Sequence, residues 1–329
     1  MTECEELFND FKSLKVGVIG DVMLDTYIWG KVDRISPEAP VPIVSLHHKE
    51  QRIGGAGNVA LNCVSLGARV FMLGITGSDE EARELEQLMK ENLIDTTGLV
   101  KSAVRATTSK TRIISRNQQM MRLDAEITDD LDKEDEKALL EKLSQFIEQE
   151  DPDILIFEDY NKGLLTEKVI EEAIALCRAS GVITAVDPKR KNFFSYQGVD
   201  IFKPNLKEVQ DGLNLLLETS DLNQLRNIHE QLQKQLQHKV SLITLSERGI
   251  FYQQLQNAAI IPSHLRNVSD VSGAGDTVIA VAAMVYAVTK NAHLMAEIAN
   301  IAGGLVCEEV GTVAVDREKL LRECELLLS

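Results

Sequence analysis

Asp270-Val-Ser-Gly-Ala-Gly-Asp276-Thr277 runs directly into the apolar segment Val278-Ile-Ala-Val-Ala-Ala-Met-Val-Tyr286. This stretch joins a glycine-rich turn, a carboxylate and the start of a buried helix. The unpaired backbone N–H groups at a helix start form a site for an anion. Gly273 and Gly275 let that backbone approach a phosphate closely, and Asp276 would lie beside it in the first turn. The stretch therefore favours phosphoryl transfer, although a capped core helix is the alternative.

Around this stretch, short β-rich apolar runs alternate with helical patterns along the chain. Buried parallel strands are predicted over 16–19, 70–73, 154–157, 182–186 and 240–245, and helices over 57–66, 79–92, 132–149, 166–180, 205–216 and 222–237. Gly67 and Gly181 stand where a helix-ending glycine belongs. The alternation predicts an α/β fold with a doubly wound, mostly parallel sheet flanked by helices. Ligands are then expected at the carboxyl ends of the strands.

Two stretches, residues 27–53 and 104–123, have strand composition without intervening helices. We expect them to form a small β-strand lid over the strand ends within a single domain spanning residues 1–329. Such sheet edges would be exposed unless they are paired, so a homodimer joined through the lids is expected.

The composition excludes several classes of protein. With 35 basic and 51 acidic residues the net charge is −16, which argues against binding a nucleic-acid backbone. No signal peptide and no apolar stretch of membrane-spanning length is visible. The five cysteines are scattered without metal-ligand spacing, which is typical of reduced thiols in the cytoplasm.

The segment Gly54-Gly-Ala-Gly57-Asn58-Val-Ala60 contains the string G-x-G-x-x-A. It does not follow a buried strand, so a nicotinamide cofactor is not favoured. A small ligand close to the glycine backbone, with the Asn58 amide bonded to a polyol, is the better interpretation. A tight turn before a helix is the alternative. Asp21 and Asp25 follow the first strand and suit sugar hydroxyls, although Asp25 could instead cap a turn.

Two further junctions suit a nucleotide. Asn205 and Glu208 share one helix face and could address a hydrated Mg²⁺, or they could form a capping box. Ser246 and Gly249 follow another strand and could meet nucleotide phosphates.

The second lid stretch carries a basic strand face. Lys110, Arg112 and Arg116 fall on one side by the two-residue period of a strand. On an acidic protein this face suggests a substrate that already carries phosphate, with help from Lys162 and Lys189. A solvated edge protected by charges is the alternative.

These motifs together resemble the ribokinase/PfkB family of carbohydrate kinases, and the resemblance covers about residues 16 to 313. Within that family, Gly20–Asp25, Arg34-Ile-Ser-Pro-Glu-Ala-Pro-Val-Pro42, Ser115–Gln119 and Arg122-Leu-Asp124 are similar to heptose 7-phosphate kinases of lipopolysaccharide biosynthesis. The resemblance implies transfer of the ATP γ-phosphoryl to the anomeric hydroxyl of D-glycero-D-manno-heptose 7-phosphate, giving the 1,7-bisphosphate.

The resemblance also implies a role for each matching position. Asp276 would be the catalytic base, kept ionised by the helix N-terminus, and the amides of Gly273, Ala274 and Gly275 the anion hole. The other implied contacts are Asp21, Asp25, Gly54, Gly55 and Asn58 to the sugar; Asn205 and Glu208 to Mg²⁺ and phosphates; Ser246 and Gly249 to ATP phosphates; Asn300, Gly303 and Gly311 to adenine; and Asp270 and Ser272 to K⁺, which relatives often bind.

Two other functions stay open. The chain could phosphorylate another sugar or sugar phosphate, such as ribose or fructose 1-phosphate. It could also be a regulator that binds a sugar or nucleotide without catalysis, although the intact Asp276 and its two glycines argue against that.

Overall fold

The computed structural model describes residues 2–116, 118–215 and 221–328. Its main sheet has the strand order β13-β12-β11-β10-β9-β8-β1-β4-β5 in this part of the chain. The strands are β1 (Lys15–Gly20), β4 (Arg69–Thr76), β5 (Ile94–Lys101), β8 (Ile154–Glu158), β9 (Ile183–Asp187), β10 (Ile201–Phe202), β11 (Val240–Thr244), β12 (Ile250–Gln254) and β13 (Asn257–Ile261). All neighbours pair in parallel except β12, which is antiparallel to β11 and β13. The predicted mostly parallel sheet is confirmed.

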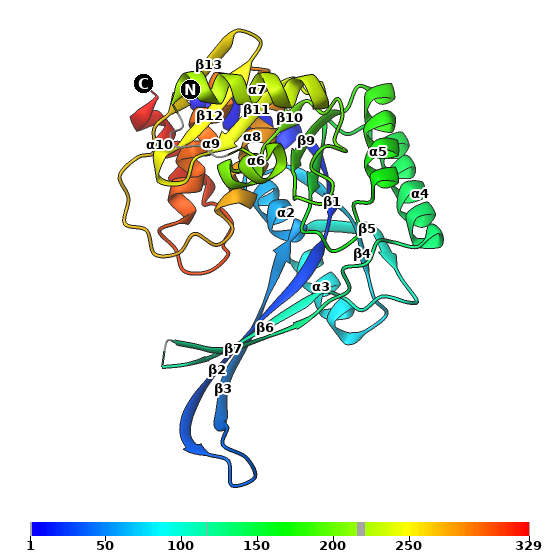
Figure 1. The fold of residues 1–329 in the computed structure, drawn as a ribbon, viewed down its shortest axis with the longest axis vertical. Coiled ribbons are helices and arrows are strands. Elements are labelled where there is room, and N and C mark those ends of the chain that lie inside the picture. Colours follow the sequence, from blue (N-terminus) through cyan, green and yellow to red (C-terminus); the bar gives the residue numbers. More distant parts are fainter. Residues whose placement is uncertain (1, 117, 216–220, 329) are drawn as a thin grey trace.

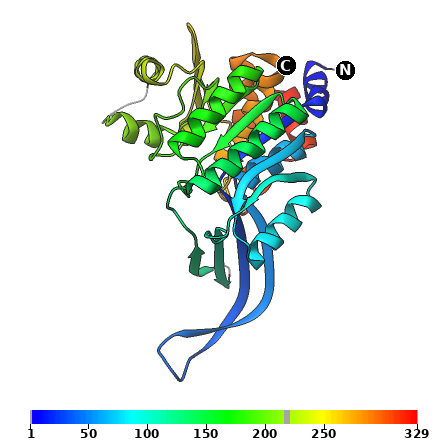
Figure 2. The same ribbon diagram turned by 90° about the vertical axis from the view of Figure 1, so that its right-hand side faces the viewer.

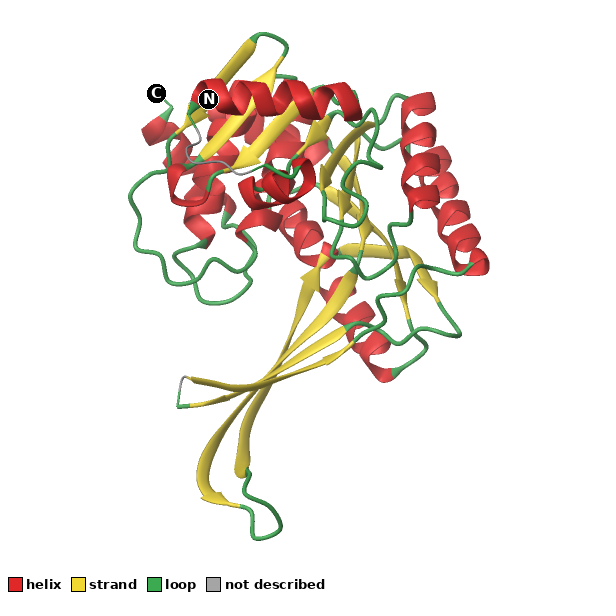
Figure 3. Ribbon diagram, viewed as in Figure 1, coloured by secondary structure: helices red, strands yellow, loops and turns green. Residues whose placement is uncertain are grey.

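Helices cover both faces of this sheet, as Figures 1 and 3 show. One apolar core lies under α1 (Glu3–Asp10), α2 (Ala56–Ser65), α3 (Glu80–Glu91), α8 (Ala274–Thr289), α9 (Ala292–Val306) and α10 (Arg317–Leu327). The other lies under α4 (Lys133–Glu150), α5 (Glu167–Ser180), α6 (Leu206–Leu213) and α7 (Leu222–Leu236). Two short 3₁₀ helices, η1 (Phe11–Ser13) and η2 (Ser246–Arg248), complete the body. Because both faces are covered, strands such as β8 are buried throughout.

Helix α8 is the centre of the first core. Every residue from Asp276 to Tyr286 is buried, which agrees with an apolar run that has no polar face. The helix begins at Ala274, directly after Gly273, so the motif of the sequence analysis lies at a helix N-terminus as predicted.

The second sheet is a long arm that projects from the body (Figures 1 and 2). Its strands are β2 (Val22–Ile35), β3 (Pro42–Gly55), β6 (Ser109–Ser115) and β7 (Gln118–Ala125), in the order β3-β2-β6-β7. The strands expected within 27–53 and 104–123 are thus present and extend further toward the body. We call this sheet the lid. Strands β2 and β6 are parallel, with Asp25 beside Lys110 and Tyr27 beside Arg112.

The structure corrects several details of the prediction. Helix α6 ends at Leu213 rather than 216, because Asn214 adopts the left-handed conformation. The elements that were not predicted include strands β5, β12 and β13 and helices α1, α9 and α10; β5 and β13 are edge strands of the sheet. Arg116 follows β6 in an exposed turn with a φ of 50°, so it does not share the strand face of Lys110 and Arg112. Across the described residues, no helix has both the length and the apolar character needed to cross a membrane.

Candidate active site

The candidate site lies where the carboxyl ends of β1, β8 and β9 meet the start of α8. Asp276, in the first turn of α8, is buried and accepts two hydrogen bonds. The Asn58 amide donates to Oδ2 at 2.7 Å, and the Tyr160 hydroxyl donates to Oδ1 at 2.8 Å. Asn58 comes from α2 and Tyr160 from the loop after β8. Three segments that are distant in the sequence therefore converge on one carboxylate.

The turn before α8 leaves backbone donors free. Gly273 has a φ of 77°, and a Cβ there would come within 2.8 Å of the Asn58 amide nitrogen. The Ala274 amide donates to the Val271 carbonyl at 3.3 Å. The amides of Gly273 and Gly275 have no acceptor among the residues that the structure describes. Free N–H groups at a helix N-terminus suit a phosphate oxygen, so two of the three amides predicted for the anion hole are available, whereas the Ala274 amide is already bonded.

Burial dominates the protonation of Asp276. It raises the pKa of this carboxyl above its ordinary value, against the lowering effect of the Asn58 and Tyr160 hydrogen bonds. The expectation that the helix N-terminus would keep Asp276 readily ionised is therefore wrong in direction. A raised pKa makes the carboxylate a better proton acceptor at neutral pH.

A cluster of buried charges adjoins the anion hole. The Lys203 ammonium lies 2.7 Å from Asp187, and the Lys189 ammonium lies 3.2 Å from Asp187. Burial raises the pKa of Asp187, but the two lysines outweigh it and hold that pKa below its ordinary value. A Cβ on Gly275 would lie 3.6 Å from Asp187 Oδ2 and 3.7 Å from Lys203 Nζ. The Lys203 ammonium thus lies close to Gly275.

Glu158, the last residue of β8, is fully buried, and neither of its carboxyl oxygens has a hydrogen-bond partner among the described residues. Burial, followed by the charges of Asp187 and Asp276, raises the pKa of Glu158 well above its ordinary value. Burial of Glu158 among other carboxyl groups thus favours its protonated form.

Asn205 and Glu208 form a capping box at the start of α6. The Glu208 amide donates to Asn205 Oδ1 at 2.8 Å, and the Asn205 amide donates to Glu208 Oε2 at 2.8 Å. Glu208 Oε1 also lies 2.9 Å from Lys189. Both carboxylate oxygens already have donors, so this pair fits an ion held through water better than a directly bound one.

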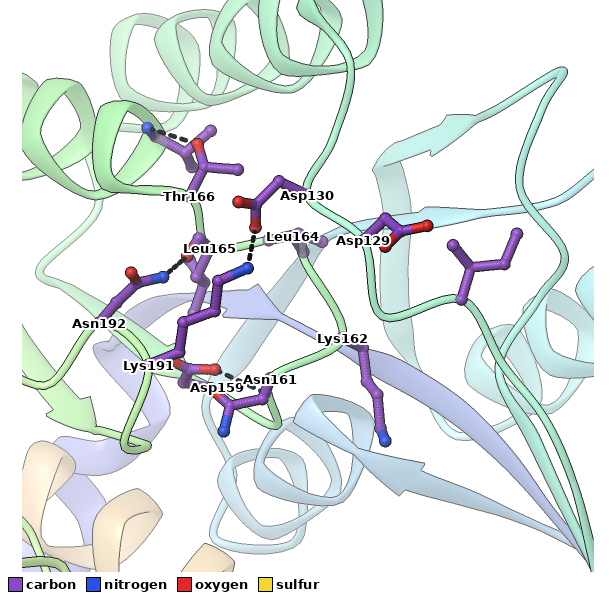
Figure 4. A network of polar contacts seen from close by, with 12 residues as sticks. Asp129, Asp130, Asp159, Asn161, Lys162, Leu164, Leu165, Thr166, Lys191 and Asn192 are labelled. Carbon is purple, nitrogen blue, oxygen red and sulfur yellow. Dashed lines mark hydrogen bonds and ion pairs between the residues drawn. The ribbon is translucent and has the colours of Figure 1, made fainter. Parts of the chain in front are cut away.

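Asp21 organises the loop that carries Tyr160. Its carboxylate accepts the backbone amides of Tyr160, Lys162 and Leu164 at 2.9, 3.1 and 3.3 Å. Figure 4 shows two further hydrogen bonds that hold this loop. The Asn192 side chain donates to the Leu165 carbonyl, and the Asp159 carboxylate accepts a hydrogen bond from the Asn161 backbone amide. The structure therefore gives Asp21 a loop-holding role that the sequence analysis did not foresee.

The lid turns its basic face toward this loop. Arg112 donates a hydrogen bond to Asp25 at 2.6 Å. Asp25 itself lies within β2, so it does not cap a turn. The Lys110 ammonium lies 5.8 Å from the centroid of the Tyr160 ring. Burial lowers the pKa of Lys110, in the direction expected for a cation leaving water.

The other predicted sugar contacts surround this face. Lys162 pairs with Glu126 at 2.7 Å instead of lying free. A Cβ on Gly54 would come within 2.2 Å of Asp25 Oδ2, and one on Gly55 within 2.3 Å of the Asp21 carbonyl. Both glycines therefore keep the backbone close to the two aspartates.

The residues predicted for K⁺ lie beside Gly273. Asp270 accepts the amide and the hydroxyl of Ser272 and the amide of Gly311. The adjacent Thr312 hydroxyl is buried and has no partner in residues 2–116, 118–215 and 221–328.

The residues predicted for nucleotide contacts are spread over neighbouring loops and α9. Ser246 is exposed in η2, and Gly249 has a φ of 96°. Asn300 donates to the Pro262 carbonyl at 2.8 Å. A Cβ on Gly303 would lie 2.7 Å from Val278, so this glycine lets α9 pack against α8. The structure thus assigns packing or loop contacts to several of these positions.

Sequence reasoning missed Tyr160, Asp187, Lys203 and Glu158 as site residues. Glu158 and Asp187 each end a strand that was predicted, so the rule that ligands lie at carboxyl ends could have found them. The Tyr160 side chain gives no such signal, because its contact depends on the loop conformation.

A cavity at the amino ends of β9 and β11 does not belong to this site. It contains the basic side chains Arg178, Lys239 and Lys290. Arg178 is in the last turn of α5, and Lys290 is the C-cap of α8. A positive charge is favourable at both places because the C-terminal end of a helix carries partial negative charge. Lys239 pairs with Asp200 at 2.6 Å. These contacts explain the charges without a ligand.

Comparison with known proteins points to the family that the sequence motifs resemble. A profile described as "pfkB family carbohydrate kinase" matches residues 13–319. The "Bifunctional protein HldE" of Helicobacter acinonychis (strain Sheeba) is 38% identical over 306 residues, which are 93% of this chain and 65% of that protein. The protein of the same name from Methylobacillus flagellatus is 40% identical over 308 residues, 94% of this chain and 62% of its own. The chain thus spans just under two thirds of these relatives.

Solved structures share the fold at low sequence identity. Escherichia coli phosphofructokinase-2 in complex with potassium matches with a TM-score of 0.80 and 16% identity, covering 96% of this chain and 99% of that one. Arabidopsis thaliana ribokinase complexed with ribose and ATP matches with a TM-score of 0.71 and 17% identity, covering 94% and 99%.

Proposed function

The chain belongs to the pfkB family of carbohydrate kinases, and on that premise we propose that it phosphorylates the anomeric hydroxyl of D-glycero-D-manno-heptose 7-phosphate. The product would be the 1,7-bisphosphate, a precursor of ADP-heptose and of the lipopolysaccharide core. One observation carries the chemistry: the Asp276 carboxylate lies in the first turn of α8, one residue after the unpaired Gly275 amide. An acceptor hydroxyl and a transferring phosphoryl group can meet there.

The proposed reaction is an in-line transfer. Asp276 orients the sugar hydroxyl and takes its proton as the new O–P bond forms and the bond from Pγ to the ADP oxygen breaks. The Gly273 and Gly275 amides, with Lys203 behind them, stabilise the charge on the transferring group. Phosphoryl transfer of this kind depends mainly on positioning and charge neutralisation.

Asn58 offers a second contact to the acceptor. Within the part of the chain that the structure describes, its buried side-chain oxygen has no donor, while its amide donates to Asp276. A buried acceptor of this kind requires a donor, and a sugar hydroxyl would supply one.

The residues present fit the expected ions in different ways. Mg²⁺, held through water near Asn205 and Glu208, would neutralise phosphate charge. Asp270, Ser272 and the unpartnered Thr312 hydroxyl supply oxygens suited to K⁺ beside the anion hole. A structural relative, E. coli phosphofructokinase-2, is known in complex with potassium, which supports testing that ion.

The choice of sugar rests on two supports. The motifs resemble heptose 7-phosphate kinases, and relatives named HldE are 36–40% identical. The basic lid face with Lys110 and Arg112 suits a sugar that already carries phosphate. Closure of the lid would exclude water from the site.

We also propose a homodimer joined through the lids. Several large apolar side chains of the lid and its connecting turn are exposed: Ile35, Val41, Leu46, Met120, Met121 and Leu123. Apolar patches of this kind usually mark an interface. Sedimentation of the protein and of a Leu46→Asp, Met121→Asp variant tests this, since the variant should sediment as a monomer.

Coupled measurement of ADP release tests the substrate. The panel is heptose 7-phosphate, heptose without phosphate, ribose and fructose 1-phosphate. Heptose 7-phosphate should give the highest kcat/KM, by about 10²-fold or more over heptose, because loss of a bidentate phosphate contact is costly. Equal kcat/KM values for the two heptoses would contradict the proposed phosphate contact of the lid. A higher kcat/KM for another sugar would identify that sugar as the better substrate and contradict the proposed one.

A further inference from the structure

Both oxygens of the Asp276 carboxylate carry a protein donor, namely Asn58 on Oδ2 and Tyr160 on Oδ1. Each oxygen of a carboxylate can accept two hydrogen bonds, so valence alone leaves room for another donor. Asp276 is only 5% exposed, however, so the most direct way for an acceptor hydroxyl to reach this carboxylate is to take the place of one of the two donors.

Asn58 is poorly placed to leave. It lies in α2 with 1% of its surface exposed, and its amide nitrogen faces Gly273, where even a Cβ would come within 2.8 Å. Tyr160 lies in a loop and is only partly buried. Its hydroxyl bond to Asp276 is 2.8 Å long.

Different contacts hold the backbone and the side chain of Tyr160. Its backbone amide is fixed on Asp21 at 2.9 Å, and the Asp21 carboxylate also holds two further amides of the loop. Two ammonium groups lie near the ring, that of Lys110 at 5.8 Å and that of Lys189 at 5.7 Å from its centroid. A rotation of the side chain would release Asp276 without moving the loop.

We propose that the Tyr160 hydroxyl occupies the acceptor's place on Asp276 in the free enzyme, and that the sugar hydroxyl displaces it on binding. This inference rests on the proposed function, in which Asp276 is the base. Tyr160 is then a positioning residue that keeps the base covered until the sugar arrives.

The two lysines give the exchange a driving force. Lys110 belongs to the lid and Lys189 to the charge cluster next to Glu208. Phosphate groups of the sugar and of ATP would draw both ammonium groups away from the ring, since a charged phosphate is a stronger partner than a π face. Binding of both substrates thus favours release of the phenol.

The shielding has a chemical consequence. A covered base cannot orient a water molecule, so ATP hydrolysis in the absence of sugar is suppressed. Burial raises the pKa of the Tyr160 phenol, with the Asp276 charge adding to the effect, so the hydroxyl stays protonated and remains a donor.

The test compares the full chain with its Tyr160→Phe and Tyr196→Phe variants, using Mg·ATP and heptose 7-phosphate. Tyr196 is the matched control, because its hydroxyl donates to the neighbouring carboxylate of Asp159 at 2.9 Å and does not contact Asp276. Initial rates are measured across pH, with and without the sugar.

For Tyr160→Phe we expect the KM of the sugar to fall by about tenfold, as loss of a competing charge-assisted hydrogen bond implies, with kcat within about threefold. The acid limb of kcat/KM, which reports the free enzyme, should move to higher pH, while that of kcat stays in place. ADP release without sugar should rise by at least about threefold, because water takes the vacated oxygen. Tyr196→Phe should change none of these.

A higher KM in Tyr160→Phe would overturn the inference, since Tyr160 would then bind the sugar itself. Equal shifts of both acid limbs, or the same changes in Tyr196→Phe, would also overturn it. If the wild-type chain does not turn over heptose 7-phosphate, the proposed substrate fails. ADP release without sugar still decides the role of Tyr160 in that case, and an unchanged rate would refute it.

Discussion

Replacement of Asp276 by Asn separates the chemistry of this carboxylate from its structural role. The new amide oxygen can accept from Asn58, and the new amide nitrogen can donate to the Tyr160 hydroxyl, which turns to accept. Both contacts, at 2.7 and 2.8 Å, are thus retained by a side chain of the same shape. The variant should fold and bind both substrates.

The expected stability follows from the pKa. Burial raises the pKa of Asp276, so folding disfavours its charged form at neutral pH. A neutral amide removes that cost, and the free energy of unfolding should stay within about 1 kcal/mol of the wild-type value or exceed it. The kcat should fall by about 10²- to 10⁴-fold, the range for loss of a general base. That loss equals roughly 3–5 kcal/mol of barrier.

The assay is steady-state ADP release, with thermal unfolding measured on the same samples. Asp159→Asn is the matched control, because Asp159 is also buried and accepts a tyrosine hydroxyl, yet it does not contact Asp276. We expect its kcat to fall by less than about tenfold. A kcat for Asp276→Asn within about threefold of wild type would refute the assignment of the base. So would a loss of activity matched by a loss of folded protein.

Three further predictions concern other parts of the chain. Gly273→Ala should lower the free energy of unfolding by about 1 kcal/mol because Gly273 has a positive φ. The added Cβ should also displace Asn58, so that kcat falls without a change in the KM of ATP. Steady-state kinetics and thermal unfolding check both effects. Arg112→Ala should raise the KM of the phosphorylated sugar by about tenfold or more and that of ATP by far less, and equal effects on both would favour a solvated lid edge. Burial lowers the pKa of His229 to about 4 and of His238 to about 3 from 6.5. The unfolded chain therefore binds more protons below pH 6.5, and Tm should fall as pH drops from there toward 4, with a flatter slope in His238→Gln.

The fold was predictable because its signals are local. Residues 154–157 of β8 form an uninterrupted apolar run, and Gly181 ends α5 with a φ of 73°. The missed strand β5 contains Asp95-Thr-Thr-Gly98 and lies at the sheet edge, where one side is less buried. A polar edge strand lacks the apolar pattern on which the prediction depended.

The site was predictable only in part. The motif at 270–277 located Asp276 and its glycines, because helix geometry alone creates the free amides. The contact between Tyr160 and Asp276 joins residues 116 positions apart and depends on one side-chain rotamer. The predicted direction of the Asp276 pKa shift was wrong for a similar reason, because burial by distant segments outweighs the effect of the local helix N-terminus.

The most direct test of the account is a crystal structure of the full chain with a non-hydrolysable Mg·ATP analogue and heptose 7-phosphate. We expect the γ-phosphate within hydrogen-bond distance of the Gly275 amide and the anomeric hydroxyl on Asp276, with the Tyr160 hydroxyl displaced. A γ-phosphate bound away from the start of α8, or a different sugar oxygen facing Asp276, would contradict it.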